Sequence, residues 1–287
     1  MRHLANDPDN LSLSTTRSVE TGVFTHVFVM QGLTTHHTVS IKEVNYAFPL
    51  WLLPAQVHPD QPLAAQRHPN LAPDFLAALA QALGRSVVGP HGLPEGVTPE
   101  DVLAYVYAVL HAHSYRSRYG EYLKGDFPRI PMQKVPVSSV NGSLPAMEFD
   151  EIWSALLPLG QELIALHLLK TVPPALRPGF ALQGDNTVVK PRYEPPHTGA
   201  NATDRGRVWI NAVQYFDGVP PETWAHKVGG YPVCEKWLKD RRGRALDFAD
   251  IGHYAGIVAA LTRTRALMAQ VDAVVDGKLW ADAASAP

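Results

Sequence analysis

The chain has 287 residues, with 25 basic and 27 acidic side chains and a formal net charge of −2 at pH 7. Hydrophobic residues make up 46% and charged residues 18%, which is a globular composition and excludes a disordered or collagen-like chain. The charge lacks the basic surplus that is typical of nucleic-acid-binding proteins. Any DNA-binding hypothesis therefore depends on where the charges lie along the chain.

The cysteine content and the hydropathy pattern indicate where the protein works. Cys234 is the single cysteine, which excludes a disulfide framework and a cysteine-rich zinc module and indicates a reducing compartment. Residues 1–10 are polar and lack a signal-peptide pattern, and no run approaches the roughly 18 apolar residues of a membrane span. We therefore expect a cytoplasmic protein with no membrane partner.

The beginning of the chain predicts strands. Apolar residues alternate with serine and threonine over residues 11–15, and Phe24–Met30 is rich in β-branched and aromatic residues. Val44–Leu53 is a short apolar run, which is typical of a buried strand. Proline and histidine dominate Pro54–Pro73, which predicts a loop.

Helical patterns follow this loop. Phe75–Leu83 predicts a short helix that ends at Gly84. Thr98–Asp101 predicts the clearest helix start, with an N-cap threonine, proline at the first helical position and acids near the positive end of the helix dipole. The pattern continues or restarts through three tyrosines at helical spacing and ends at Gly125. These tyrosines are Tyr115, Tyr119 and Tyr122.

The second half of the chain mixes helices and strands. The expected elements are a loop at Val135–Pro145, a helix at Glu148–Lys170 that restarts or kinks at Pro158, strands at Thr187–Tyr193 and Arg207–Val213, and a long helix at Phe248–Val275. The predicted fold class is α+β, with a strand-rich N-terminal part, a helical middle, a short second sheet and a long C-terminal helix. We expect one domain over residues 1–287, which divides, if at all, into two subdomains near 135–145.

A search for catalytic motifs yields no positive match. The sequence has neither the phosphate loop of a nucleotide-driven motor nor a Gly-x-Gly-x-x-Gly after a strand. Glu194–His197 departs from the loop of an amino-methyltransferase at both its first and its last residue, so we reject this match. His111 and His113 diverge on a helix, which favours surface or helix-end histidines over a metal site. No Gly-x-Ser-x-Gly elbow supports a hydrolase. We therefore expect no catalytic and no metal-binding residues.

The near-neutral total charge conceals two basic segments. Residues 114–142, the first basic segment, carry a net charge of +3, and residues 225–245, the second basic segment, carry +4. Residues 44–113 carry −3. A duplex carries about one negative charge per 1.7 Å of its axis, so cations gathered on one face would bind it. The alternative is that the tyrosines of the first segment belong to the core and its arginines form a solvated face.

Several long blocks resemble the C-terminal specificity domain of type ISP restriction-modification enzymes. These blocks are Tyr105–Pro131, Gln214–Trp224, Gly229–Arg244 and Asp250–Tyr254, together with the shorter Asn10–Arg17 and Phe24–Phe28. The resemblance covers nearly the whole chain and implies a target recognition domain that reads an asymmetric sequence in double-stranded DNA.

The resemblance also implies which activities lie elsewhere. In such enzymes a nuclease, an ATP-driven motor and an adenine-N6 methyltransferase precede this domain in the same polypeptide. S-adenosylmethionine, ATP and Mg would belong to those domains, so we expect no cofactor in this chain. The expected partners are double-stranded DNA and the methyltransferase and motor domains. Whether the chain is a fragment or a separately encoded subunit stays open.

Candidate DNA contacts fall into two groups. The phosphate-contact candidates are Arg116, Arg118, Lys124, Arg129, Lys236, Lys239, Arg241 and Arg242. The base-contact candidates lie outside most of the resembling blocks, because positions that set specificity should vary, and they are Arg17, His26, His37, Lys42 and Glu43. Structural roles stay open: Asp240 would hold Arg241 or Arg244 in an ion pair, and Arg129 would belong to another.

Three hypotheses for function result. The leading one is sequence-specific DNA recognition that serves methylation and cleavage by other domains. The second is an interaction module that docks on a methyltransferase or motor through Phe248–Val275, without reading DNA itself. The third is a stand-alone hydrolase with dispersed serine and histidine residues, which no motif supports.

Overall fold

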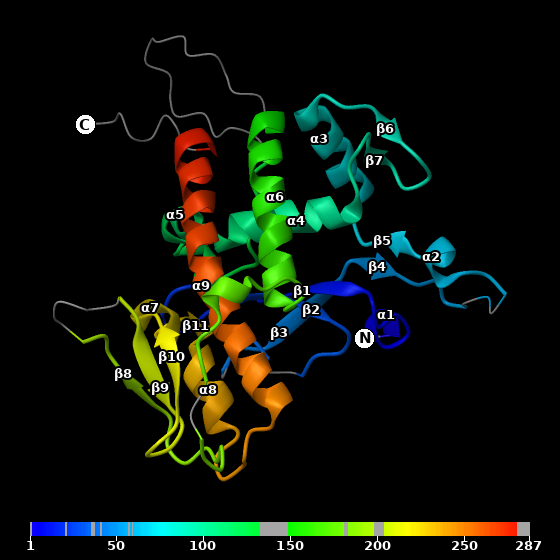
Figure 1. Ribbon diagram of the computed structural model, residues 1–287. Helices are drawn as coiled ribbons and strands as arrows, with labels where there is room; N and C mark the ends of the chain where they lie inside the picture. The colour runs from blue at the N-terminus through cyan, green and yellow to red at the C-terminus, as the bar shows by residue number, and fades with distance from the viewer. Residues whose placement is uncertain are drawn as a thin grey trace, which may run out of the picture. The chain divides into compact units, whose positions relative to one another are not determined.

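The computed structural model describes residues 2–20, 22–35, 38–40, 42–56, 58, 60–132, 149–180, 183–197 and 204–279 (Figure 1). Helices and small antiparallel sheets are mixed along these residues, which confirms the predicted α+β class. The chain divides into two compact units. Unit 1 consists of Met1–Ile164 with Leu267–Pro287, and unit 2 consists of Ala165–Ala266.

Unit 1 has a strand-rich start followed by helices, as the sequence predicts. Its elements are α1 (Arg2–Ala5), β1 (Leu11–Thr16), β2 (Val27–Gln31), β3 (Asn45–Pro49), β4 (Trp51–Leu52), α2 (Leu63–Gln66), β5 (His68–Pro69), α3 (Pro73–Leu83), β6 (Val87–Val88), β7 (Leu93–Pro94), α4 (Pro99–His111), α5 (His113–Arg118), the 3₁₀ turn η1 (Tyr122–Lys124), most of α6 (Phe149–His167) and the π-helix η3 (Val275–Leu279).

The first sheet has three antiparallel strands in the order β2-β1-β3. The predicted strand at residues 11–15 is confirmed, and its Leu13 pairs with Val29 on one side and Phe48 on the other. The prediction of one buried strand over Val44–Leu53 is wrong, because this stretch divides into β3 and β4 and Phe48 is 41% exposed. β3 lies at the edge of a small sheet, so alternate side chains stay accessible to solvent.

Two helices of unit 1 end or begin where the sequence predicts. α3 stops at Gly84, whose φ of 64° is the left-handed cap conformation that glycine adopts readily. At the start of α4, the hydroxyl of Thr98 accepts a hydrogen bond from the amide of Asp101, and the Asp101 carboxylate accepts one from the amide of Thr98. This capping box fixes the beginning of a helix whose Tyr105 and Tyr107 are buried.

α6 contains a proline and a glycine with different consequences. Of the two alternatives for Pro158, a restart of the helix is wrong, because α6 runs through this residue without a break. A β-carbon at Gly160 would come within 1.9 Å of the carbonyl oxygen of Ala104 in α4, so the two helix backbones meet there. The predicted loop at Val135–Pro145 lies outside the described residues.

The tyrosine segment restarts after α4. α4 ends at His111, Ala112 takes an extended conformation with a ψ of 125°, and α5 begins at His113. Tyr115 is buried, whereas Tyr122 in η1 is 78% exposed. The three tyrosines that share one helical spacing in the sequence therefore have different surroundings.

Unit 2 contains a second small sheet and the larger part of a long helix, and both are predicted. Its elements are the 3₁₀ turn η2 (Pro174–Leu176), β8 (Arg192–Glu194), β9 (Gly206–Trp209), β10 (Tyr215–Val219), α7 (Pro221–Trp224), β11 (Lys227–Val228), β12 (Tyr231–Pro232), α8 (Val233–Lys239) and α9 (Phe248–Val274), whose end belongs to unit 1. The sheet has the order β10-β9-β8 and is antiparallel throughout.

The strand predictions in unit 2 are partly wrong. Most of Thr187–Tyr193 is irregular, because Val188 is fully buried and donates its amide to the carbonyl of Arg244 rather than to a neighbouring strand. β9 ends at Trp209, and β10 is an additional strand that the sequence reading missed. Its Gly218, at a φ of 90°, sits in a bulge and breaks the strand pattern in the sequence.

The core of unit 2 joins its second sheet to α8 and α9. Phe216, Cys234 and Tyr254 are among its fully buried members. Burial raises the pKa of the Cys234 thiol to about 12, which makes it an unreactive packing residue.

Candidate nucleic-acid interface

Two base-contact candidates are exposed and hold surface ion pairs. The Arg17 side chain is 62% exposed, and its Nε lies 3.5 Å from Oδ1 of Asp126. The Lys42 side chain is 58% exposed, and its Nζ lies 4.0 Å from Oε2 of Glu20. Surface pairs of this kind contribute little stability, so both cations can exchange partners. His37 lies outside the described residues, and all three remain predictions.

His26 and Glu43 form a buried pair. His26 Nε2 lies 3.8 Å from Glu43 Oε2, and the two side chains are only 6% and 8% exposed. Glu43 also accepts hydrogen bonds from the Ser40 hydroxyl and from the amide of Glu20. Burial raises the pKa of Glu43, but these hydrogen bonds outweigh it and leave the pKa lowered; burial lowers the pKa of His26 despite the attraction of Glu43. This burial weighs against direct base contacts by either residue.

Arg116 is a half-buried arginine that stabilises the end of α4. Its Nε donates a hydrogen bond to the carbonyl oxygen of Leu110, at 2.6 Å. Burial lowers the pKa of Arg116 to about 10, against the attraction of Tyr107 and Asp272. The guanidinium is still charged at neutral pH, and a cation at the carbonyl end of a helix is favourable. This placement weighs against a phosphate contact by Arg116.

Three further cations of the first basic segment lie among the described residues, and all three are exposed. Arg118 lies near the end of α5, and Lys124 Nζ lies 2.8 Å from Oε1 of Glu121. The side chain of Arg129 has no partner among the described residues, so the expected ion pair is not seen there. Of these three cations, Arg129 is the one most available to an anion.

Two of the three lysines of the second basic segment lie in α8, and both are paired with carboxylates there. Lys236 Nζ lies 2.7 Å from Oδ2 of Asp240, and Lys239 Nζ lies 2.9 Å from Oε1 of Glu235. Both pairs join residues four positions apart, which face each other on a helix. The positive electrostatic potential around these lysines is therefore smaller than their number implies.

The arginines that follow α8 are held by a more distant carboxylate. The expectation that Asp240 holds Arg241 or Arg244 is wrong, because Asp250 pairs with both arginines. The Arg241 guanidinium also lies over the Trp237 ring, 3.5 Å from its centre. Burial raises the pKa of Asp250, but a backbone amide and the two arginines leave it lowered. Asp250 lies in the first turn of α9, so only tertiary contacts bring it to this position.

A groove in unit 2 presents cations that the charge count along the sequence missed. It has a volume of about 630 Å³ and is lined by Asp185, Val189, Lys190, Arg192, Asn211, Ala212 and Val213. Arg242 adjoins it, since its Nε donates a hydrogen bond to the carbonyl oxygen of Val189, at 3.1 Å. We call these residues together the basic groove.

Cations outnumber carboxylates in the basic groove, with Lys190, Arg192 and Arg242 against Asp185. Lys190 has no side-chain partner among the described residues, and the Arg192 side chain is 58% exposed and 3.9 Å from Glu194. Lys190 and Arg192 are two positions apart in the sequence, so this short basic stretch could have been found there. Its proximity to Arg242 depends on backbone hydrogen bonds of Val188 with residues 243 and 244, which no local pattern predicts.

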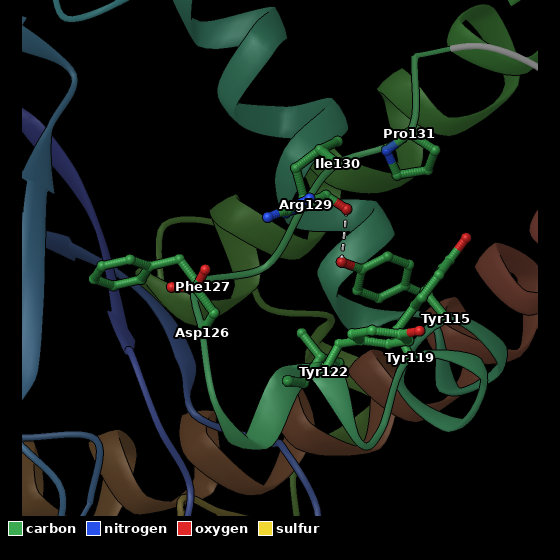
Figure 2. Close-up of a pocket in the computed structure, with 9 residues that line it drawn as sticks. Tyr115, Tyr119, Tyr122, Asp126, Phe127, Arg129, Ile130 and Pro131 are labelled. Carbon is green, nitrogen blue, oxygen red and sulfur yellow. Dashed lines mark hydrogen bonds between the residues drawn. The ribbon is translucent and has the colours of Figure 1, made fainter.

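The first basic segment encloses a pocket of about 570 Å³ in unit 1 (Figure 2). Its lining residues are Tyr115, Tyr119, Tyr122, Leu123, Asp126, Phe127, Arg129, Ile130 and Pro131. The ring centres of Tyr115 and Tyr119 are 5.2 Å apart, and those of Tyr119 and Tyr122 are 6.5 Å apart. The Tyr115 hydroxyl donates a hydrogen bond to the carbonyl oxygen of Arg129, at 2.8 Å. We call this pocket the tyrosine pocket.

His111 and His113 each have a hydrogen-bond partner on their own helix, α4 and α5 respectively. His111 Nδ1 lies 2.7 Å from the carbonyl oxygen of Tyr107, and His113 Nδ1 lies 3.3 Å from the Ser117 hydroxyl. Within the described ranges, no three His, Cys, Asp or Glu side chains gather as a metal site would require.

None of the helices in the described part of the chain combines the length and the apolar character of a membrane span.

Comparison with known proteins identifies relatives of this arrangement. The sequence matches the family described as the type ISP C-terminal specificity domain over residues 1–270. No curated protein matches the chain. Similar solved structures include the ATP-dependent type ISP restriction-modification enzyme LlaBIII bound to DNA (17% identity, TM-score 0.59), a nuclease-deletion mutant of the type ISP enzyme LlaGI with a DNA substrate mimic (17%, 0.54) and a DrdV–DNA complex (20%, 0.59).

The two kinds of comparison establish different things. The structural matches cover 91%, 92% and 92% of this chain, which in turn spans 16%, 21% and 24% of those longer chains. Identity this low shows a shared fold. The family match extends over nearly the whole sequence, and therefore the chain belongs to the family of type ISP C-terminal specificity domains.

Proposed function

We propose that the chain recognises a specific sequence in double-stranded DNA, as the specificity module of a type ISP restriction-modification enzyme. The observation that carries this proposal is the family match over residues 1–270. It is supported by the three similar structures, each of which was solved with DNA or a DNA substrate mimic.

The basic groove supplies the sequence-independent part of such binding. Exposed cations without a close carboxylate gain the most from a phosphate, because they release counterions from the DNA without first breaking an ion pair. Lys190 and Arg242 meet this condition, and Arg192 is only weakly paired at 3.9 Å. Phosphate contacts of this kind would set the register of the duplex, and base contacts would then select the sequence.

Adenine-N6 methylation and ATP-dependent cleavage belong, in this proposal, to other domains in the same or a separate polypeptide. Those domains would bind S-adenosylmethionine, ATP and Mg. A methyltransferase domain would also contact the DNA, so binding by this chain alone is expected to be weaker and more sensitive to salt than binding by the assembled enzyme.

The test is a selection experiment on the purified chain. A pool of random-sequence duplexes is bound at low salt, with and without a type ISP methyltransferase domain, and the bound fraction is sequenced. We expect one asymmetric sequence to be enriched, more strongly with the methyltransferase domain present. Failure to enrich any sequence under both conditions overturns the proposal.

The alternative is a module that docks on a methyltransferase or motor through α9 and does not read DNA itself. Such a helix should present an exposed apolar stripe to its partner. Throughout α9, which the structure describes completely, Phe248 is the one large apolar side chain that is strongly exposed, at 92%. The alternative is therefore less well supported than DNA recognition, and enrichment by the chain alone would exclude it.

A further inference from the structure

We propose that the tyrosine pocket accepts a single unstacked nucleobase, with Arg129 binding the neighbouring phosphate. The proposal rests on the proposed function, because it assigns to one site of the DNA-binding chain a ligand that is not a stacked base pair. The ligand would come from a single strand, or from an unpaired or mismatched position in a duplex.

The tyrosine pocket presents the exposed ring of Tyr122 and the partly exposed ring of Tyr119 to a planar ligand, beside the buried ring of Tyr115. In Figure 2 the rings of Tyr115, Tyr119 and Tyr122 gather on one side of the pocket, whereas Phe127 points away from them. Tyr122 is 78% exposed, so its ring is free to stack on a ligand without leaving a packed core. Stacking on exposed aromatic rings is the usual way in which proteins bind single-stranded bases, and it tolerates any base.

The pocket is held in shape by contacts at both of its ends. The hydroxyls of Tyr115 and Tyr105 donate hydrogen bonds to the carbonyl oxygens of Arg129 and Pro131, at 2.8 and 2.7 Å. The Phe127 ring packs edge-on against Phe48 of β3, with ring centres 5.5 Å apart. The segment that closes the pocket is therefore anchored to α4, to α5 and to the first sheet, which reduces the entropy cost of binding.

The charges at the pocket favour a nucleotide over an uncharged ring. Arg129 is exposed and has no side-chain partner among the described residues. Asp126, the carboxylate of the lining, lies 3.5 Å from Nε of Arg17 and is partly neutralised by it. An aromatic or proline side chain from a partner protein would fill the pocket and contact its rings, but it would leave Arg129 without an anion. A nucleotide supplies both the planar ring and the phosphate.

The size of the pocket agrees with this ligand. A volume of about 570 Å³ lies within the range of small-molecule sites, and it leaves room for a base together with its sugar. Because a base must leave its stack to enter, the pocket should favour DNA in which a base is already unpaired.

The experiment compares two single strands of equal length and charge. One is an oligothymidine and the other carries abasic sites throughout, and the affinity of the full chain for each is measured by fluorescence anisotropy at low salt. We expect the oligothymidine to bind roughly tenfold more tightly, because only it can stack in the pocket. Tyr122→Ala should abolish this difference, and Tyr122→Phe should keep it, since the phenylalanine ring still stacks.

A matched control and a second probe separate this inference from the proposed function. Phe248→Ala removes a similarly exposed ring outside the pocket and should leave the difference unchanged. Affinity for a random-sequence paired duplex is measured with each variant and should not change in Tyr122→Ala. Equal affinity of the wild-type chain for both strands, or a difference that survives Tyr122→Ala, overturns the inference.

The remaining outcomes assign failure to one proposal or the other. If the wild-type chain binds the paired duplex but shows no base-dependent difference, the pocket inference is wrong and the proposed function stands. If the chain binds no DNA of either kind, the inference is overturned, and the proposed function fails as well only if no duplex binds in the presence of a methyltransferase domain. If Tyr122→Ala instead weakens binding to a methyltransferase domain, the pocket accepts a protein side chain and the inference is overturned.

Discussion

The two groups of cations in unit 2 differ in what surrounds them. In and just after α8, Lys236, Lys239 and Arg241 each lie within 3.6 Å of a carboxylate oxygen. In the basic groove, Lys190 has no side-chain partner among the described residues, and Arg242 donates to a backbone carbonyl. The charge count along the sequence identified the first group and, of the second, only Arg242, yet the second group carries the more available charge. A charge count along a chain is therefore a poor guide to the field that DNA would meet.

Replacing the three cations of the basic groove should have the largest effect on DNA affinity. The triple variant Lys190→Ala, Arg192→Ala, Arg242→Ala is expected to lower the affinity for random duplex roughly 100-fold at low salt, about 2.7 kcal/mol, and to reduce the salt slope by about 3. Anisotropy titrations over a series of salt concentrations measure both quantities.

A control for the groove variant removes the same charge elsewhere in unit 2. Lys170, Arg177 and Arg265 are exposed and lie outside the basic groove. Their triple alanine variant should lower the affinity much less than the groove variant does. Equal losses in the two variants would show that only the total charge of the chain matters, and that the groove has no special role.

Removing the carboxylate that holds two arginines should have the next largest effect. Asp250→Asn leaves Arg241 and Arg244 without their shared charge partner. We expect the free energy of unfolding to fall by about 1–2 kcal/mol and duplex affinity to rise a few-fold, because the local positive charge increases. Urea unfolding and DNA titration measure the two effects. Unchanged duplex affinity would indicate that this cluster does not face the DNA.

Replacing the paired lysines of α8 should have a smaller effect. Lys236→Ala with Lys239→Ala is expected to change duplex affinity by about threefold or less and stability by less than about 1 kcal/mol, since each removes one half of an exposed pair. A loss as large as that of the groove variant would break the comparison, because it would show that paired lysines exchange freely onto phosphates.

The smallest expected effect is on the free energy of unfolding. It comes from the buried pair of His26 and Glu43 and appears only at acidic pH. Because burial lowers the pKa of His26 below 6.5, the unfolded chain binds a proton before the folded chain as the pH falls. The lowered pKa of Glu43 acts in the same direction at lower pH. The free energy of unfolding should therefore decrease below a pH of 6.5.

Urea unfolding at neutral and mildly acidic pH tests this sign. His26→Gln should flatten the dependence in the range just below 6.5 and leave the contribution of Glu43 at lower pH. His113→Gln, which replaces an exposed histidine, should not change the dependence. A wild-type stability that rises as the pH falls would contradict the buried placement of His26.

Local patterns predicted those elements whose ends carry strong signals. Thr98 and Asp101 start α4, Gly84 ends α3, and α9 follows its predicted range within one residue. The wrong strand predictions arise where a run of apolar or β-branched residues resembles a buried strand but does not form one. Val188 is a β-branched residue that packs in the core, yet its backbone is irregular. Val44–Leu53 is apolar, although part of it lies at an exposed sheet edge.

By itself, the sequence determined the α+β class, the main helices and the family, because capping signals, hydropathy and long ordered blocks are local or collinear. Only the tertiary structure decided which cations are available. Asp250 reaches Arg241 and Arg244 through the packing of α9. Arg242 reaches the carbonyl of Val189, the neighbour of Lys190, through backbone pairing across more than 50 residues. Charge neutralisation depends on distances of a few ångströms in space, and these are set by the fold rather than by separation along the chain.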